Sequence, residues 1–85
     1  MSETQSPDAD AMHRWLLDRA AEFLQVPRGD ISAETPLTDH GLTSVTAVAF
    51  SSAIEEEYRV PFGLDDLWAA DTIEGIVARL MTETE

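Results

Sequence analysis

Hydrophobic residues recur at helical spacing in three stretches of the 85-residue chain. In the first stretch they follow the i, i+1, i+4, i+7, i+8 pattern of one buried helix face: Leu16, Leu17, Ala20, Phe23 and Leu24. Ser6 and Pro7 resemble the N-cap and the first residue of this helix, and Pro27 prevents it from continuing far beyond Leu24. The pattern predicts a first helix from about residue 7 to residue 24.

A second helix is predicted from Ser44 to Tyr58, with Thr43 as its N-cap. Val45 and Val48 form a short apolar patch on this helix. A longer stripe with larger side chains runs beside it: Ala47, Phe50, Ile54 and Tyr58. A helix in a small bundle normally needs one core face. We therefore expect the longer stripe to point inward and the two valines to point outward.

The third strongly periodic stretch predicts the last helix, because its apolar residues match the i, i+3, i+4, i+7 template: Ile73, Ile76, Val77 and Leu80. Asp71 or Thr72 is the expected N-cap, and Asp71 with Glu74 resembles a capping box. Pro61 separates this region from the second helix, and residues 64–68 have the length of one short helical turn.

Residues 27–43 connect the first two helices and contain two prolines and two glycines. Ile31 and Leu37 are the apolar residues expected to anchor this connection. No segment shows the alternation of a strand. The sequence therefore predicts an all-α four-helix bundle with a long first loop and a short third helix. A loop of this length in a small domain is uncommon unless it has a function.

The charge of the chain restricts its partners. The chain contains 17 acidic and five basic residues, which gives a formal net charge of −12. Nucleic acid and anionic membranes are poor partners for such a surface, and basic protein surfaces are good ones. We expect a cytoplasmic protein, because no apolar run approaches a membrane span and no signal peptide leads the chain. We also expect a monomer. With no cysteine and two scattered histidines, no metal site is predicted.

The segment that carries chemistry is residues 39–45, DHGLTSV. It places Ser44 in the first turn of a helix, where backbone N–H groups and the helix dipole favour a phosphate. One alternative is that Ser44 is simply a capping serine. Asp39, His40 and Ser44 are also the residue types of a hydrolytic triad, but no Gly-x-Ser-x-Gly elbow surrounds Ser44. We therefore expect a protein that is not an enzyme.

The GLTSV segment at 41–45 resembles the Gly-x-Asp-Ser-Leu signature of acyl carrier proteins. Residues 24–26 (LQV), 35–37 (TPL), 53–58 (AIEEEY) and 71–76 (DTIEGI) are similar to other segments of the family, so that the resemblance covers residues 12–81. It implies an acyl carrier domain at 7–82, between a disordered N-terminal tail at 1–6 and a C-terminal tail at 83–85.

The resemblance implies that Ser44 carries 4′-phosphopantetheine, attached from coenzyme A by a phosphopantetheinyl transferase. The arm ends in a thiol that holds acyl groups as thioesters and presents them to ketosynthases, acyltransferases or other acyl-processing enzymes. The family also presents an apolar patch beside its serine and an acidic flank to partners, which points to Val45, Val48, Glu55 and Glu56 here. Local stability does not explain the glutamates, because the helix dipole disfavours negative charge in a last turn.

The departures from the family pattern concern the pathway. Thr43 replaces the usual Asp, Val45 replaces the usual Leu, and Thr46 and Ala49 stand where acidic residues are common in fatty-acid-type carriers. These changes favour a polyketide-type or other specialised carrier over one of primary fatty acid biosynthesis. The alternative is an acidic helical interaction module without a prosthetic group, which would leave the glycine–serine junction unexplained.

Overall fold

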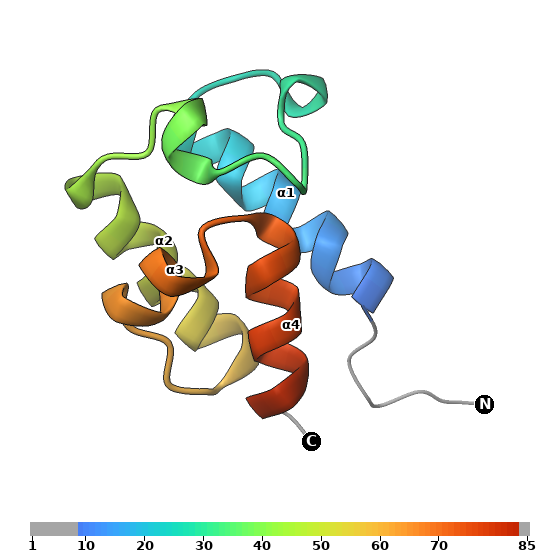
Figure 1. The fold of residues 1–85 in the computed structure, drawn as a ribbon, viewed down its shortest axis with the longest axis vertical. Coiled ribbons are helices and arrows are strands. Elements are labelled where there is room, and N and C mark those ends of the chain that lie inside the picture. The colour runs from blue at the N-terminus through green and yellow to red at the C-terminus, as the bar shows by residue number, and fades with distance from the viewer. Residues whose placement is uncertain (1–8, 84–85) are drawn as a thin grey trace.

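Four α-helices form the bundle in the computed structural model, which describes residues 9–83 (Figure 1). They are α1 (Ala9–Leu24), α2 (Ser44–Tyr58), α3 (Leu64–Ala70) and α4 (Ile73–Glu83). Two short 3-10 helices, η1 (Arg28–Asp30) and η2 (Leu37–His40), lie in the connection between α1 and α2. No strand occurs within the described range. The predicted all-α fold, with its long first loop and short third helix, is confirmed.

The ends of the chain bear on two of the sequence predictions. The predicted tail at residues 1–6 and the helix start at Ser6 and Pro7 lie outside the described residues. At the other end, α4 runs to Glu83, one residue beyond the boundary that we expected for the C-terminal tail. None of the helices in the described part of the chain is long and apolar enough to cross a membrane.

Helix α2 has the predicted bounds because local chemistry fixes both of its ends. The Thr43 hydroxyl oxygen accepts a hydrogen bond from the Thr46 N–H at 3.2 Å, so Thr43 is the N-cap. At the other end Arg59 adopts the left-handed conformation with φ 58° and donates its N–H to the Glu55 carbonyl at 2.8 Å.

The predicted capping box at the start of α4 is wrong in one respect. Thr72, not Asp71, caps the helix, because its hydroxyl oxygen accepts a hydrogen bond from the Gly75 N–H at 2.9 Å. Asp71 instead ends α3, with φ 67° and its N–H donated to the Leu67 carbonyl at 2.9 Å. The Glu74 N–H donates to the Ala33 carbonyl of the long loop at 3.0 Å. Only two residues separate the helices, so Asp71 is already occupied by the end of the first one.

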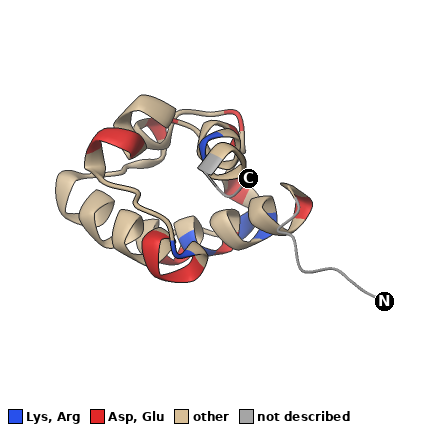
Figure 2. Ribbon diagram, turned by 90° about the horizontal axis from the view of Figure 1, so that it is seen from below, with Lys and Arg blue, Asp and Glu red and all other residues tan. Residues whose placement is uncertain are grey.

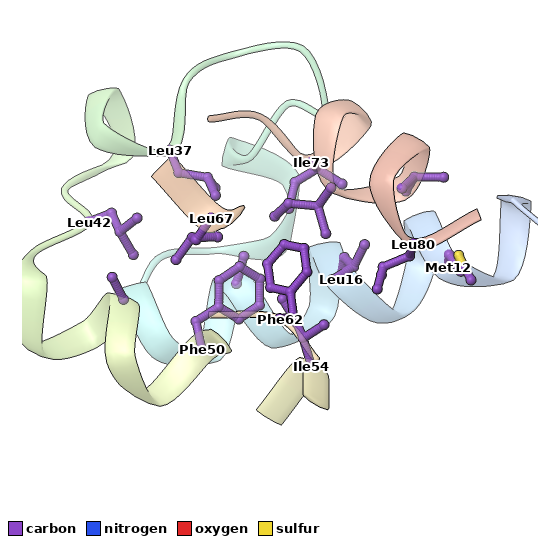
Figure 3. Packing of buried hydrophobic residues seen from close by; sticks show 14 of the residues in the cluster. Met12, Leu16, Leu37, Leu42, Phe50, Ile54, Phe62, Leu67, Ile73 and Leu80 are labelled. Atoms are coloured by element: carbon purple, nitrogen blue, oxygen red, sulfur yellow. The ribbon is translucent and has the colours of Figure 1, made fainter. Parts of the chain in front are cut away.

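The core gathers side chains from all four helices and from the segments between them (Figure 3). Phe50 and Ile54 of α2 are buried as predicted, and Tyr58 at the end of the same stripe is half-buried. The buried face of α1 differs from our expectation. It is centred on Met12, Leu16, Ala20 and Ala21, whereas Leu17, Phe23 and Leu24 are only partly buried.

The long loop is fastened to the bundle at two predicted anchors, Ile31 and Leu37, which are both buried. The Leu37 N–H also donates to the Asp71 carbonyl at 2.8 Å. Together with the bond from Glu74 to Ala33, this contact ties the loop to the junction between α3 and α4. The loop therefore has a fixed course toward the start of α2.

Helix α3 is tied closely to α4. The Ala70 carbonyl lies where a Cβ on Gly75 would be, so this approach requires a glycine. Asp66 accepts hydrogen bonds from the Arg79 guanidinium at 2.8 Å and from the Gly63 N–H at 3.0 Å. These bonds, the one from Arg79 first, hold the pKa of Asp66 below its ordinary value.

Candidate functional site

The turn that leads into α2 is built by Gly41 and Leu42. Gly41 has φ 97°, in the left-handed region that glycine adopts without strain, and its N–H bonds to carbonyls of η2. Leu42 is buried and donates its N–H to the Leu37 carbonyl at 3.2 Å. The glycine reverses the chain and the leucine anchors it, which leaves the next two residues, Thr43 and Ser44, on the surface.

Ser44 is the first residue of α2, and its side chain is exposed. Thr43 is the residue that caps the helix, so the interpretation of Ser44 as a capping serine is wrong. No side-chain hydrogen bond in residues 9–83 engages the Ser44 hydroxyl. The hydroxyl is therefore accessible for covalent modification.

The surroundings of Ser44 are compatible with a phosphodiester. The first N–H groups of a helix have no partner within it, and the dipole places partial positive charge there. The first turn of α2 contains no acidic residue that would repel an anion. In the described part of the chain, no group of three or more His, Cys, Asp or Glu side chains is placed to hold a metal ion. This helix end is therefore electrostatically suited to a covalent phosphate on Ser44.

The three residues considered as a hydrolytic triad do not form one in the structure. No hydrogen bond among the described residues links Asp39, His40 and Ser44. The Nε2 atom of His40 is buried without a hydrogen-bond partner in this part of the chain, and Asp39 is exposed. His40 thus turns one ring nitrogen into the protein.

Exposed apolar side chains lie next to Ser44 on α2. Val45 is 82% exposed and Val48 is 50% exposed, which confirms that they point away from the core. Trp68 of α3 is 40% exposed and is the other large exposed hydrophobic residue of the described chain. The valines lie one and four residues after Ser44, so they flank it on the first turns of the helix.

The two glutamates that we grouped with these valines lie elsewhere. Glu55 and Glu56 are 11 and 12 residues beyond Ser44, which places them about 17–18 Å along the helix axis. Glu55 has a structural partner that the sequence did not reveal, because its Oε2 accepts a hydrogen bond from the Phe62 N–H at 2.8 Å. Local stability therefore explains one residue of the acidic run, which corrects our expectation. Glu56 is exposed, and it lines an open hollow together with Trp15 of α1.

A family model described as the phosphopantetheine attachment site matches residues 14–80. This range contains Ser44 and most of the four helices. No curated protein sequence matches the chain.

Three solved structures share the fold. One is the HMG-ACPI domain from the CurA module of Lyngbya majuscula, with a TM-score of 0.85, 17% identity, and coverage of 98% of this chain and 89% of that one. A second is a free-standing peptidyl carrier protein from an uncharacterized secondary metabolic pathway of Acinetobacter baumannii, with a TM-score of 0.87, 22% identity, and coverage of 92% and 98%. A third, holo T3CT, has a TM-score of 0.68, 27% identity, and coverage of 86% and 99%.

The family match spans well over half of the chain, and the fold agrees with it from end to end of the described helices. Proteins of this family are generally non-catalytic carriers that bind 4′-phosphopantetheine covalently. The accessible serine at a helix N-terminus belongs to the matched range. The chain is accordingly a carrier domain and a member of the phosphopantetheine attachment site family.

Proposed function

We propose that Ser44 is the residue that carries the 4′-phosphopantetheine arm of this carrier domain. The observation that carries the proposal is the exposed, unengaged hydroxyl at the N-terminus of α2, inside the range matched by the family model. When bound, the arm supplies a thiol that holds acyl groups as thioesters. The chain has no cysteine, so this thiol would be the only one on the molecule.

The residues around Ser44 have positioning roles in this function. Gly41 and Leu42 fix the turn, and Thr43 caps the helix by accepting a hydrogen bond from the Thr46 N–H. The N–H groups of the first turn that have no partner would stabilise a phosphate on Ser44. The domain thereby holds the base of the arm in one place and leaves the reactions of the acyl group to other enzymes.

The enzymes that we propose as partners are a phosphopantetheinyl transferase and acyl-processing enzymes such as ketosynthases or acyltransferases. Val45, Val48 and Trp68 are the exposed apolar residues of the described chain that such partners would cover. The residues that differ from fatty-acid-type carriers, Thr43, Thr46 and Ala49, favour a role in polyketide or other specialised acyl-chain biosynthesis. The charge of −12 supports a monomer, because like-charged copies repel each other.

Coexpression with a phosphopantetheinyl transferase, followed by intact-protein mass spectrometry, tests the attachment site. We expect the parent chain to gain the mass of one phosphopantetheine and Ser44→Ala to fold but remain unmodified. Ser52→Ala is the matched control, because Ser52 is an exposed serine of the same helix. Modification of Ser44→Ala, or loss of modification in a folded Ser52→Ala, would contradict the proposal.

The apolar surface is tested by Val48→Asp. Its matched control is Ala78→Asp, which adds the same charge at an exposed position of α4. A partner that covers Val48 would bury the unpaired Asp charge, at a cost of more than about 1 kcal/mol, so we expect Val48→Asp to slow modification by about fivefold or more while circular dichroism remains that of the parent. Equal rates for the two variants would mean that the transferase binds another surface, for example the long loop or the Trp68 segment.

A further inference from the structure

Main-chain hydrogen bonds connect the junction between α3 and α4 with the turn that precedes Ser44. The Asp71 carbonyl of the junction accepts a hydrogen bond from the Leu37 N–H at 2.8 Å. The Leu37 carbonyl in turn accepts a hydrogen bond from the Leu42 N–H at 3.2 Å. Leu42 lies two residues before Ser44. Leu37 is therefore bound both to the α3–α4 junction and to the turn that leads to Ser44.

Side-chain packing reinforces this connection. Leu37, Leu42 and Leu67 of α3 are all buried, and Figure 3 shows their side chains at the same end of the core. The Glu74 N–H at the start of α4 donates a second hydrogen bond to the long loop, at the Ala33 carbonyl. Two main-chain bonds and a shared apolar contact region thus fix η2 to the junction. A displacement of the junction will therefore displace η2 as well.

The backbone of the junction is strained. Asp71 has φ 67° and ψ −30°, and the Thr72 N–H donates to the Ala70 carbonyl at 2.7 Å across it. This is the pattern of a γ-turn with positive φ, which is rare and costly for a residue other than glycine. The Asp71 side chain forms no hydrogen bond or ion pair within residues 9–83 that would offset the cost. Strained residues persist only where their surroundings hold them, so the bond from Leu37 helps to keep this conformation.

We propose that the α3–α4 junction and the turn before Ser44 are conformationally coupled through Leu37. Release of the strained conformation at Asp71 loosens the turn, and, because such coupling is reciprocal, a group that orders the turn stabilises the junction. Trp68 is exposed on α3 three residues before Asp71, so a partner that covers Trp68 acts on the junction and thereby on the base of the arm. This functional meaning rests on the proposed attachment of the arm to Ser44, whereas the coupling itself requires no modification.

Asp71→Val and Asp71→Asn form the pair of variants that tests the coupling. Both remove one negative charge from a molecule in which acidic segments, in red, recur (Figure 2), so their effects on the electrostatic field are the same. Asparagine tolerates positive φ, whereas a β-branched valine does not. The two variants therefore differ mainly in the backbone conformation that they permit at residue 71.

Amide hydrogen exchange of the full chain without the arm, followed by NMR, measures local opening at each hydrogen bond. Relative to exchange at Leu16 in α1, we expect exchange at Leu37, Gly41 and Leu42 to be about tenfold faster in Asp71→Val than in Asp71→Asn. Faster exchange at Leu37 alone would overturn the proposal, because the turn would then be independent of the junction. An equal increase at Leu16 would also overturn it, because the whole domain would then be unfolding.

The matched control makes the same comparison at Arg59, the left-handed residue at the opposite end of α2 from Ser44. The Arg59 N–H is bonded to the Glu55 carbonyl and not to the long loop, so Arg59→Val and Arg59→Asn should differ by less than about twofold at Gly41 and Leu42. A difference as large as that of the Asp71 pair would overturn the proposal. Because exchange is measured without the arm, the result is independent of which residue the transferase modifies, which mass spectrometry determines separately.

Discussion

The carboxylate of Glu55 accepts a hydrogen bond from the backbone N–H of Phe62, with 2.8 Å between Oε2 and N. The bond joins the last turn of α2 to the segment that leads into α3. The Phe62 side chain is buried in the core, so the position of its backbone matters to the packing around it. Glu55 therefore stabilises the turn between two helices, although it belongs to an exposed acidic run.

Glu55→Ala is expected to lower the free energy of unfolding by about 1–3 kcal/mol, because it leaves a partly buried N–H without its acceptor. Glu56→Ala removes the same kind of side chain one residue later, where no hydrogen bond within residues 9–83 is lost. We expect it to change stability by no more than about 0.5 kcal/mol. Urea unfolding followed by circular dichroism measures both, and equal losses would show that the bond to Phe62 contributes nothing.

Ile54→Ala tests the inward face of α2. Ile54 is fully buried, and truncating such a side chain typically costs about 2–5 kcal/mol. A small domain has little more stability than this, so the melting temperature should fall clearly. Val45→Ala serves as the control, because Val45 is on the exposed face of the same helix. A melting temperature unchanged by Ile54→Ala would mean that α2 is rotated from the orientation described.

Gly75→Ala tests the close approach of α3 and α4. A Cβ at this position would clash with the Ala70 carbonyl, and this backbone atom, at the end of α3 and directly before a two-residue connection, has little freedom to move. We expect a loss of about 1–3 kcal/mol in thermal or urea unfolding, in spite of the higher helix propensity of alanine. Gly29→Ala is the matched control, because nothing lies within 4 Å of the position that its Cβ would take. Should Gly75→Ala prove as stable as Gly29→Ala, the two helices are further apart than described.

Tyr58 is the only tyrosine, so its ionisation can be followed by ultraviolet absorbance. Burial and the neighbouring Glu57 raise its pKa from 10.0 to about 12. A folded pKa above the unfolded value means that the neutral form favours the fold. The contribution is complete below pH 10.0 and is lost as the pH rises toward about 12. A midpoint near 10.0 in the folded protein would place the hydroxyl in solvent.

The parts of the fold that local chemistry determines were predictable from sequence. The start of α2 requires only a threonine that bonds to the N–H three residues later, and Thr43 does so. The buried face of α4 follows from uninterrupted apolar periodicity, and all of its expected members are buried. The position of Ser44 follows from both signals, because the cap sets where the helix begins.

The parts that depend on contacts between elements were not predictable in this way. Asp71 looked like a helix cap, yet the short connection uses it to end α3. Glu55 reaches Phe62 only because the chain turns back after α2, and no periodic pattern indicates that turn. The buried face of α1, in contrast, could have been predicted, because Met12, Leu16 and Ala20 repeat at intervals of four.

The junction between α3 and α4 has a mechanical consequence. The Thr72 N–H donates a hydrogen bond to the Ala70 carbonyl at 2.7 Å. The same carbonyl lies close to Gly75, which has no side chain to clash with it. The Arg79 guanidinium also donates a hydrogen bond to Asp66. Within residues 9–83, a single side-chain hydrogen bond, from Phe62 to Glu55, joins the segment before α3 to α2. We therefore expect α3 and α4 to move together relative to α2, the helix that begins at Ser44.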